Sequence, residues 1–253
     1  MSKLMKTNEM EIRGPGHPTQ SQLALGEGEI LKLRIDGWIK LGPTEIGLED
    51  SVLKFAHQIG EPRPSRKGKG LVEKLTPVAT EKSHPCSLSA RFGTGAFPFH
   101  TDTAHWLAPV RFVVLACVSP GQANRPTLIL PVDRLDFQPT DRRLFTEGVF
   151  LVTNGRSSFY SGMMPENERY IRFDPGCMTP ITSQAEKAWE VALHKIGKAT
   201  PVAINWRPGD ILLIDNWRTL HGRGDGPEDD DRLLLRVLVQ TQSNLWGKND
   251  ASI

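Results

Sequence analysis

The chain has 253 residues, of which 38% are hydrophobic and 24% charged, as expected for a globular protein with a sizeable core. Its formal net charge is only +2, so no overall basic field indicates a nucleic-acid partner. The three cysteines are widely spaced and form no Cys-x-x-Cys, which supports neither a disulfide framework nor a zinc knuckle and predicts reduced thiols in the cytoplasm. The sequence shows no signal-peptide pattern and no apolar stretch of membrane-spanning length, so we expect no membrane partner.

The N-terminal part mixes helix and strand signals with breaker-rich segments. Gly-Pro and His-Pro pairs interrupt residues 1–27, which predicts a loosely packed arm. A loose alternation over residues 29–39 predicts a first strand or two, and apolar residues at helical spacing over 48–59 predict a helix. Residues 61–70 are basic and rich in Pro and Gly. They favour a mobile solvated loop, and the alternative is a loop that grips an anionic substrate or closes as a lid.

Short strand signals separated by turns dominate the rest. Residues 111–119 are almost continuously apolar and predict a central strand buried on both faces. A helix is predicted over 182–196 and a short one near 141–146, and Asn154-Gly155 predicts a hairpin. The remaining predicted strands cover 71–78, 127–132, 151–153, 157–160, 170–173, 202–206, 211–216 and 233–240. Many short strands with few helices and no linker predict one mainly β domain with flanking helices, a sandwich or barrel of the jelly-roll kind.

A metal-ligand pattern stands out at His100-Thr101-Asp102, within a run of β-type residues. In a strand, His100 and Asp102 would project from one face, with Thr101 turned away. His221 follows the predicted strand 211–216 and is the natural third ligand, since a β-barrel brings the ends of distant strands to one mouth. Two histidines and one carboxylate with open positions form the facial triad of non-haem Fe(II) oxygenases.

These motifs resemble the taurine dioxygenase and clavaminate synthase superfamily. The resemblance covers about residues 85–240, and it rests on His100-x-Asp102, His221-Gly-Arg, the Arg232/Arg236 pair and the flanking segments 95–99 and 218–220. It implies a cupin-like double-stranded β-helix. It also implies a dioxygenase that uses O₂, converts 2-oxoglutarate to succinate and CO₂, and hydroxylates, desaturates or cyclises a small molecule such as an amino acid or a natural-product intermediate.

The resemblance also assigns roles to residues. His100, Asp102 and His221 would bind Fe(II), with no catalytic residue beyond this metal site. Arg232 would bind the distal carboxylate of 2-oxoglutarate, to which a planar guanidinium is suited. Thr127 would support the same carboxylate, although Asn124-Arg125-Pro126 replaces the Gly-Gly-Asp that commonly precedes this threonine.

Other residues keep two interpretations. Arg236 would lie on the same strand face as Arg232 and either meets an anionic substrate or forms a structural salt bridge. His105 and Trp106 line the substrate pocket or pack as an aromatic beside a polar side chain. Arg156, Arg172 and Arg223 could supply positive charge around an anionic substrate, but the favoured interpretation places each at the solvated surface.

Asn216 is expected to fix the turn before His221 through its side-chain amide.

Two different functions also remain open. One is a zinc-dependent hydrolase or isomerase, which would leave Thr127 and Arg232 without a purpose. The other is a non-catalytic ligand-binding jelly roll. The sequence does not indicate an oligomeric state.

Overall fold

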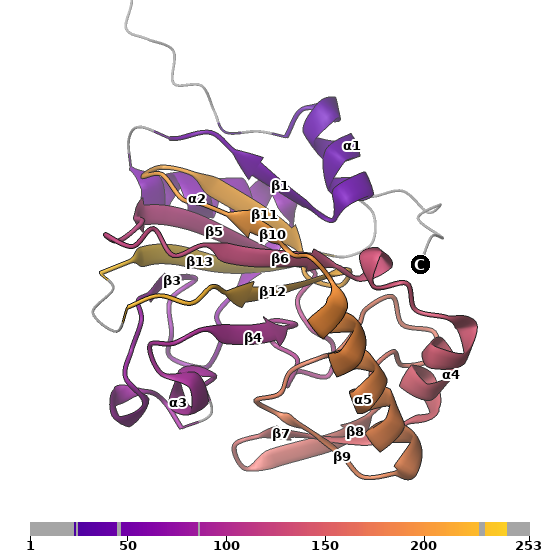
Figure 1. Ribbon diagram of the computed structural model, residues 1–253. Coiled ribbons are helices and arrows are strands. Elements are labelled where there is room, and N and C mark those ends of the chain that lie inside the picture. Colours follow the sequence, from indigo (N-terminus) through magenta and orange to yellow (C-terminus); the bar gives the residue numbers. More distant parts are fainter. Residues whose placement is uncertain (1–22, 24, 45–46, 86, 228–230, 242–253) are drawn as a thin grey trace, which may run out of the picture.

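Two antiparallel sheets pack against each other in the computed structural model, with helices on the outer faces (Figure 1). The structure describes residues 23, 25–44, 47–85, 87–227 and 231–241, so most of the predicted N-terminal arm lies outside it. The mainly β jelly roll predicted from the sequence is confirmed. None of the helices in these ranges is long and apolar enough to cross a membrane.

The secondary structure is a series of short strands with five α-helices among the described residues. The strands are β1 (Trp38–Leu41), β2 (Glu61–Arg63), β3 (Val72–Leu75), β4 (Phe97–His100), β5 (Phe112–Ser119), β6 (Thr127–Pro131), β7 (Phe150–Asn154), β8 (Ser157–Ser161), β9 (Met178–Pro180), β10 (Val202–Ile204), β11 (Ile211–Asp215), β12 (Thr219–Arg223) and β13 (Leu233–Gln240). The α-helices are α1 (Glu27–Asp36), α2 (Leu48–Ile59), α3 (Ser89–Phe92), α4 (Pro139–Glu147) and α5 (Ser183–Lys198), with 3₁₀ turns at Thr80–Lys82 and Val132–Leu135.

The larger sheet has the strand order β1-β11-β5-β13-β2, with β3 also paired to β13, and the smaller sheet has the order β10-β6-β12-β4. β5 shows why the long apolar run becomes a central strand. Val113 and Leu115 pack into the core with residues of the smaller sheet, whereas Val114 and Ala116 pack against the helix α2 side. Alternate side chains of one strand thus fill two separate cores, as predicted.

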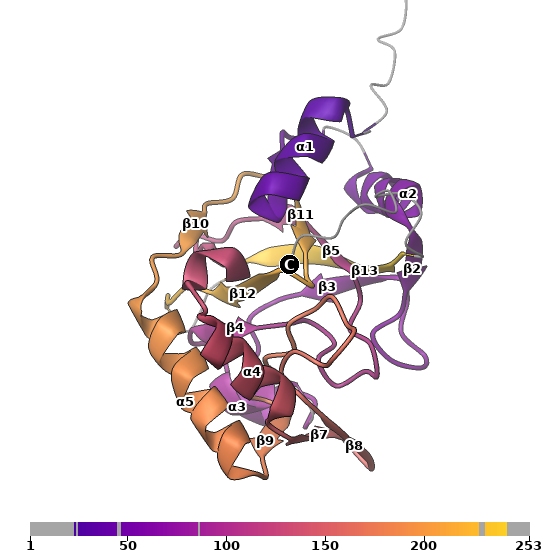
Figure 2. The same ribbon diagram turned by 90° about the vertical axis from the view of Figure 1, so that its right-hand side faces the viewer.

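A third sheet, β8-β7-β9, and the helices α4 and α5 form a separate part of the core beside the smaller sheet (Figure 2). The hairpin at Asn154-Gly155 joins β7 to β8, and Gly155 has a φ of 57°. Thr182 caps α5 by accepting a hydrogen bond from the Ala185 amide at 3.2 Å. The hairpin was predicted by the sequence, and the cap fixes the start of the helix that was predicted over 182–196.

Three local predictions were wrong. Residues 29–36 belong to α1 and not to a strand, and only Trp38 and Ile39 of the predicted range lie in β1. α1 has acidic residues in its first turn and the left-handed Gly37 (φ 75°) at its end. Residues 170–173 are irregular, because their amides bond one at a time to separate segments, as Ile171 does to Trp217 O at 3.0 Å. β4 ends at His100, so Asp102 lies in a turn and not on the strand.

Candidate metal centre

The pairing of β4 with β12 brings two of the predicted ligands together. His221 lies directly opposite His100 in the antiparallel register, and the centroids of their rings are 4.5 Å apart. Gly222 permits this close approach, since a Cβ there would lie 2.8 Å from the Phe97 carbonyl oxygen. The predicted ligands His100, Asp102 and His221 therefore meet, and one ligand atom from each lies within 4.8 Å of the others.

The two histidines are buried and suited to hold a cation as neutral rings. Nδ1 of His100 lies 3.0 Å from the Pro98 carbonyl oxygen, which makes Nδ1 the donor and leaves Nε2 as a free ligand atom. Burial and the neighbouring His221 ring lower the pKa of His100, although Asp102 opposes this shift. His221 Nδ1 is a buried atom with no hydrogen-bond partner among the described residues, and His221 Nε2 lies 3.7 Å from Asp102 Oδ2. This donor set fits a divalent metal ion.

Backbone anchors, and not a β-strand, position Asp102. The buried Asn216 accepts a hydrogen bond from the Asp102 amide at 2.8 Å and donates to the Asp102 carbonyl oxygen at 3.0 Å. It also donates to the Val110 carbonyl oxygen at 2.8 Å. Thr101, the residue before Asp102, is held in place by its hydroxyl, which donates to the Ile171 carbonyl oxygen at 2.9 Å. The side-chain amide of Asn216 therefore holds the metal-ligand turn and not the turn before His221, which corrects the sequence prediction.

Arg172 supports the same loop from the other side. It is 1% exposed, so the predicted surface position was wrong. Its guanidinium donates to the carbonyl oxygens of Ala104, of Trp106 at 2.6 Å and of Leu107 at 2.8 Å. A single guanidinium thus donates to three carbonyl groups of the backbone segment that follows Asp102.

Arg223 is also buried, contrary to the prediction. It donates from Nη2 to the Gly93 carbonyl oxygen at 2.7 Å and from Nε to the Gly95 carbonyl oxygen at 2.9 Å. Its guanidinium lies 3.8 Å from the centre of the Phe97 ring. The arginine of the His221-Gly-Arg motif therefore ties β12 to the segment leading into β4.

Arg236 forms the salt bridge that was one of its two predicted roles. Its Nη1 lies 3.0 Å and 3.2 Å from the two oxygens of Asp102, and its Nη2 lies 2.6 Å from Glu73 Oε2. Burial raises the pKa of Asp102, but the Arg236 guanidinium and His221 outweigh it and hold this pKa well below its usual range. Asp102 is thus kept as a carboxylate, the form that binds metal.

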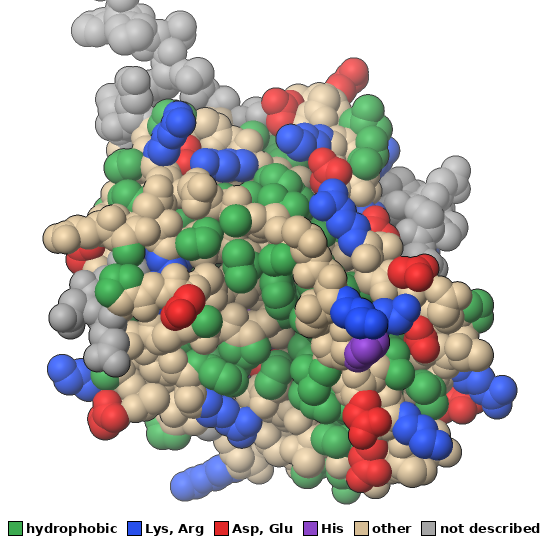
Figure 3. Space-filling view, viewed as in Figure 1, with side chains coloured by type: hydrophobic (Ala, Val, Ile, Leu, Met, Phe, Trp, Pro, Cys, Tyr) green, Lys and Arg blue, Asp and Glu red, His purple; other side chains and the backbone are tan. Residues whose placement is uncertain are grey.

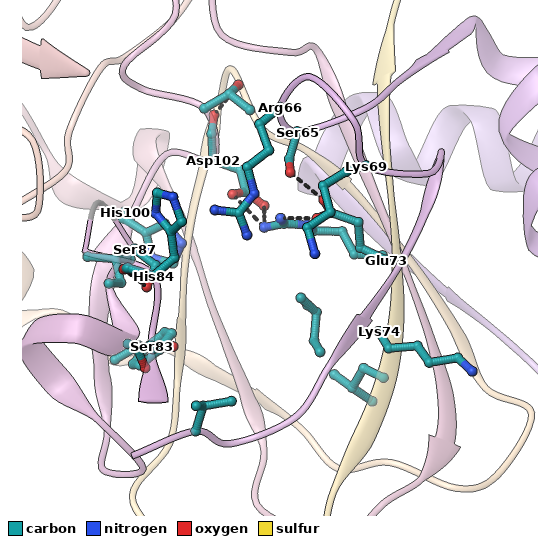
Figure 4. Close-up of a pocket in the computed structure, with 18 of the residues that line it drawn as sticks. Ser65, Arg66, Lys69, Glu73, Lys74, Ser83, His84, Ser87, His100 and Asp102 are labelled. Carbon is teal, nitrogen blue, oxygen red and sulfur yellow. Dashed lines mark hydrogen bonds and ion pairs between the residues drawn. The ribbon is translucent and has the colours of Figure 1, made fainter. Parts of the chain in front are cut away.

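All the other predicted site residues line one cavity around the triad, with a volume of about 1180 Å³ (Figure 4). On its walls are Thr127, Arg232, Arg236, His105 and Trp106. The Thr127 hydroxyl oxygen accepts a hydrogen bond from Trp206 Nε1 at 3.1 Å, so its own proton is available to a ligand. The 93% buried Arg232 donates from Nη1 to the Arg125 carbonyl oxygen at 3.2 Å.

Two features of the cavity were missed or left open by the sequence. Residues 64–67, 69 and 70 of the basic segment line the cavity, and the Ser65 hydroxyl donates to Glu73. The buried Asp174 also lines the cavity and accepts from the Gly176 amide at 2.6 Å. The sequence pattern does not identify Glu73 or Asp174 as residues of the site, because their partners are brought to them only in the folded chain.

Comparison with known proteins is consistent with this geometry. The Taurine catabolism dioxygenase TauD, TfdA family matches residues 123–238, which include Thr127, His221 and Arg232. This match covers somewhat less than half of the chain and lies in its C-terminal part. The chain is 29% identical over 178 residues to clavaminate synthase 2 of Streptomyces clavuligerus, a match that covers 62% of this chain and only 54% of that protein.

Several solved structures share the fold of this chain. An asparagine oxygenase in complex with Fe(II), 3-hydroxyasparagine and succinate has a TM-score of 0.68 at 21% identity, covering 85% of this chain and 78% of the other. The non-heme iron oxygenase OrfP in complex with Fe and alpha-ketoglutaric acid has a TM-score of 0.64 at 21% identity, covering 86% and 81%. The double-stranded β-helix implied by the sequence is confirmed.

Proposed function

We propose that this protein is an Fe(II)- and 2-oxoglutarate-dependent dioxygenase that oxidises a small molecule. The observation that carries the proposal is the convergence of His100, Asp102 and His221 within 4.8 Å in a cavity that Thr127 and Arg232 also line. A cavity with a few convergent polar groups is the typical form of an active site. The match of residues 123–238 to the TauD/TfdA family supports the same reaction class.

The triad would bind Fe(II) through one nitrogen of each histidine and one Asp102 oxygen. Three protein ligands on one face of the ion leave positions for 2-oxoglutarate and O₂. When bound, the iron supplies the O₂-activating chemistry, and conversion of 2-oxoglutarate to succinate and CO₂ supplies the electrons. Asp102 must then exchange its contact with Arg236 for the metal, or bind with one oxygen and keep the salt bridge with the other.

Arg232 and Thr127 would hold the distal carboxylate of 2-oxoglutarate. The Arg232 guanidinium is buried and anchored through the Arg125 carbonyl oxygen, so it is oriented before the ligand arrives. The Thr127 hydroxyl oxygen already accepts a hydrogen bond from Trp206 Nε1, so the hydroxyl proton can be donated to the same carboxylate. A charge-assisted contact to a buried guanidinium is stronger than one at the surface.

The substrate is proposed to be an amino acid or a natural-product intermediate. The related structures contain hydroxylated asparagine and hydroxylated arginine. His105 and Trp106 lie on the cavity wall beside the metal ligands, where they would contact the substrate. Arg236 would offer a cation to it if the salt bridge to Glu73 opens.

The test is the formation of succinate from 2-oxoglutarate by the purified protein with Fe(II) and O₂, first without and then with candidate amino acids. We expect slow substrate-independent turnover that an accepted amino acid accelerates, and none in Asp102→Ala. Equal turnover in Asp102→Ala would contradict the metal assignment. Activity restored only by Zn²⁺, without 2-oxoglutarate consumption, would favour the zinc hydrolase or isomerase instead.

A further inference from the structure

The cavity carries far more positive than negative charge. Eight lysine and arginine side chains line it, against the three carboxylates Glu73, Asp102 and Asp174. By contrast, basic and acidic side chains are interspersed on the face shown in Figure 3. The formal net charge of the whole chain is only +2, so the excess in the cavity is a local feature.

The assigned cofactors do not account for this excess. The 2-oxoglutarate dianion neutralises the charge that Fe(II) brings, so a loaded site keeps the charge of the protein groups around it. Arg236 is balanced by Asp102 and Glu73, and Arg223 is occupied by backbone carbonyl groups. The cations left over after Arg232 are those at the cavity mouth, which are Arg66, Lys67, Lys69, Lys74 and Lys82.

Two of these cations point inward. In Figure 4, Arg66 and Lys69 point from their loop into the cavity, whereas Lys74 points away from it. In the described part of the chain, neither Arg66 nor Lys69 has a carboxylate within ion-pair distance. The cavity wall formed by Ser83, His84 and Ser87 carries no acidic group to neutralise them.

The loop that carries this pair is joined to the metal centre. The Ser65 hydroxyl donates to one Glu73 oxygen, and the other Glu73 oxygen accepts from Arg236, which contacts Asp102. Glu73 belongs to β3, which pairs with β13. The loop is therefore fastened to the same sheet that carries Arg236, and its two cations belong to the cavity.

We infer that Arg66 and Lys69 form a second anion subsite at the cavity mouth, which binds a phosphate or carboxylate group of the oxidised substrate. The inference rests on the proposed function and adds the substrate class: a small molecule with an oxyanion remote from the carbon that is oxidised. A guanidinium supplies a planar pair of donors and an ammonium a compact charge, and both are suited to an oxyanion. The cavity is large enough for such a substrate beside 2-oxoglutarate.

The experiment titrates phenyl phosphate and benzoate into anaerobic protein with Fe(II) and saturating 2-oxoglutarate, followed by calorimetry at two ionic strengths. Wild-type protein is compared with Arg66→Gln/Lys69→Gln, and the control is Lys187→Gln/Lys198→Gln, which removes the same charge from α5 outside the cavity. We expect the affinity of the loop variant for one or both ligands to be at least about tenfold lower than that of the wild type. The affinity of the control variant should change by less than about twofold. Binding by the wild type should weaken as salt is added.

Comparison of phenyl phosphate with benzoate shows whether the subsite binds a phosphate or a carboxylate group. No binding of either ligand by the wild type, an unchanged affinity in the loop variant, or an equal loss in the control would each overturn the inference. The visible absorption band of iron-bound 2-oxoglutarate is recorded in the same samples. Its absence from the wild type would contradict the proposed function, while the titration would still decide whether Arg66 and Lys69 bind the anion.

Discussion

Replacing Asn216 by alanine should damage the metal centre without removing any metal ligand. Three hydrogen bonds would be lost, two to the backbone of Asp102 and one to the Val110 carbonyl oxygen. Asn216 and Val110 are fully buried, so water does not replace these partners without rearrangement. At about 1–3 kcal/mol for each buried group left unsatisfied, and with part of the loss relieved by relaxation, we expect a cost of about 3 kcal/mol in unfolding free energy.

The effect on metal binding is the more specific part of this prediction. Asn216 sets the direction of the turn that presents Asp102, and the loss of such a supporting contact typically weakens metal binding by about ten- to a hundredfold. The assays are urea unfolding of the metal-free protein and anaerobic calorimetric titration with Fe(II). Both are performed at a temperature at which the variant is more than nine-tenths folded, which requires roughly 1.4 kcal/mol of remaining stability.

The control is Thr182→Ala, which removes the α5 cap far from the triad. Thr182 accepts hydrogen bonds from the Val149 and Ala185 amides, and its loss should cost about 1–2 kcal/mol while leaving Fe(II) affinity unchanged. If Asn216→Ala binds Fe(II) as tightly as the wild type, the argument that Asn216 positions Asp102 is refuted. An equal loss of affinity in Thr182→Ala would show that the assay reports only global stability.

Three further predictions concern Arg232, Arg172 and His100. Arg232→Ala should weaken 2-oxoglutarate binding by at least about tenfold in calorimetry and leave Fe(II) affinity nearly intact, so an unchanged 2-oxoglutarate affinity would contradict its assignment. Arg172→Gln should lower the unfolding free energy by about 3 kcal/mol, because the carbonyl groups of residues 104 and 106 lose the Arg172 donor and that of residue 107 keeps only the Tyr170 hydroxyl; a change below about 0.5 kcal/mol in urea unfolding would contradict this. The folded-state pKa of His100 lies below its ordinary value of 6.5, so the unfolded chain binds the proton more readily and the stability of metal-free protein should fall as pH decreases below about 6.5. Urea unfolding from pH 7.5 to 5.5 measures this slope, and a slope that is the same in His100→Gln would show that other groups cause it.

Elements that obey a simple periodicity were predictable from the sequence. β5 and β11 are apolar runs at the centre of a sheet, and α2 and α5 show apolar stripes with clear ends. β12 was not recognised as a strand. All five of its residues are buried, yet Thr219, His221 and Arg223 give it the polar composition of a loop. Its polar side chains belong to the candidate metal centre and the contacts around it, so β12 lacks the apolar pattern by which a buried strand is recognised.

The proposed metal ligands were predictable, whereas the residues that position them were not. His100, Asp102 and His221 belong to motifs of fixed spacing, and the structure brings them together as the sequence implied. Arg172 and Asn216 act through contacts with segments 65 to 114 residues away in the sequence, and no local spacing encodes such contacts. α1 was mispredicted for a different, local reason, because its acidic first turn and the terminal Gly37 outweigh a weak alternation of apolar residues.

The most direct test of the central claim is an anaerobic titration of the metal-free protein with Fe(II) and 2-oxoglutarate, followed by visible absorption. If His100, Asp102 and His221 bind Fe(II) and leave adjacent positions open, the 2-oxo acid will chelate the iron and a metal-to-ligand charge-transfer band will appear. The band should saturate at one equivalent of Fe(II), and it should require a higher 2-oxoglutarate concentration in Arg232→Ala. A well-folded wild-type protein that develops no band under these conditions would contradict the account.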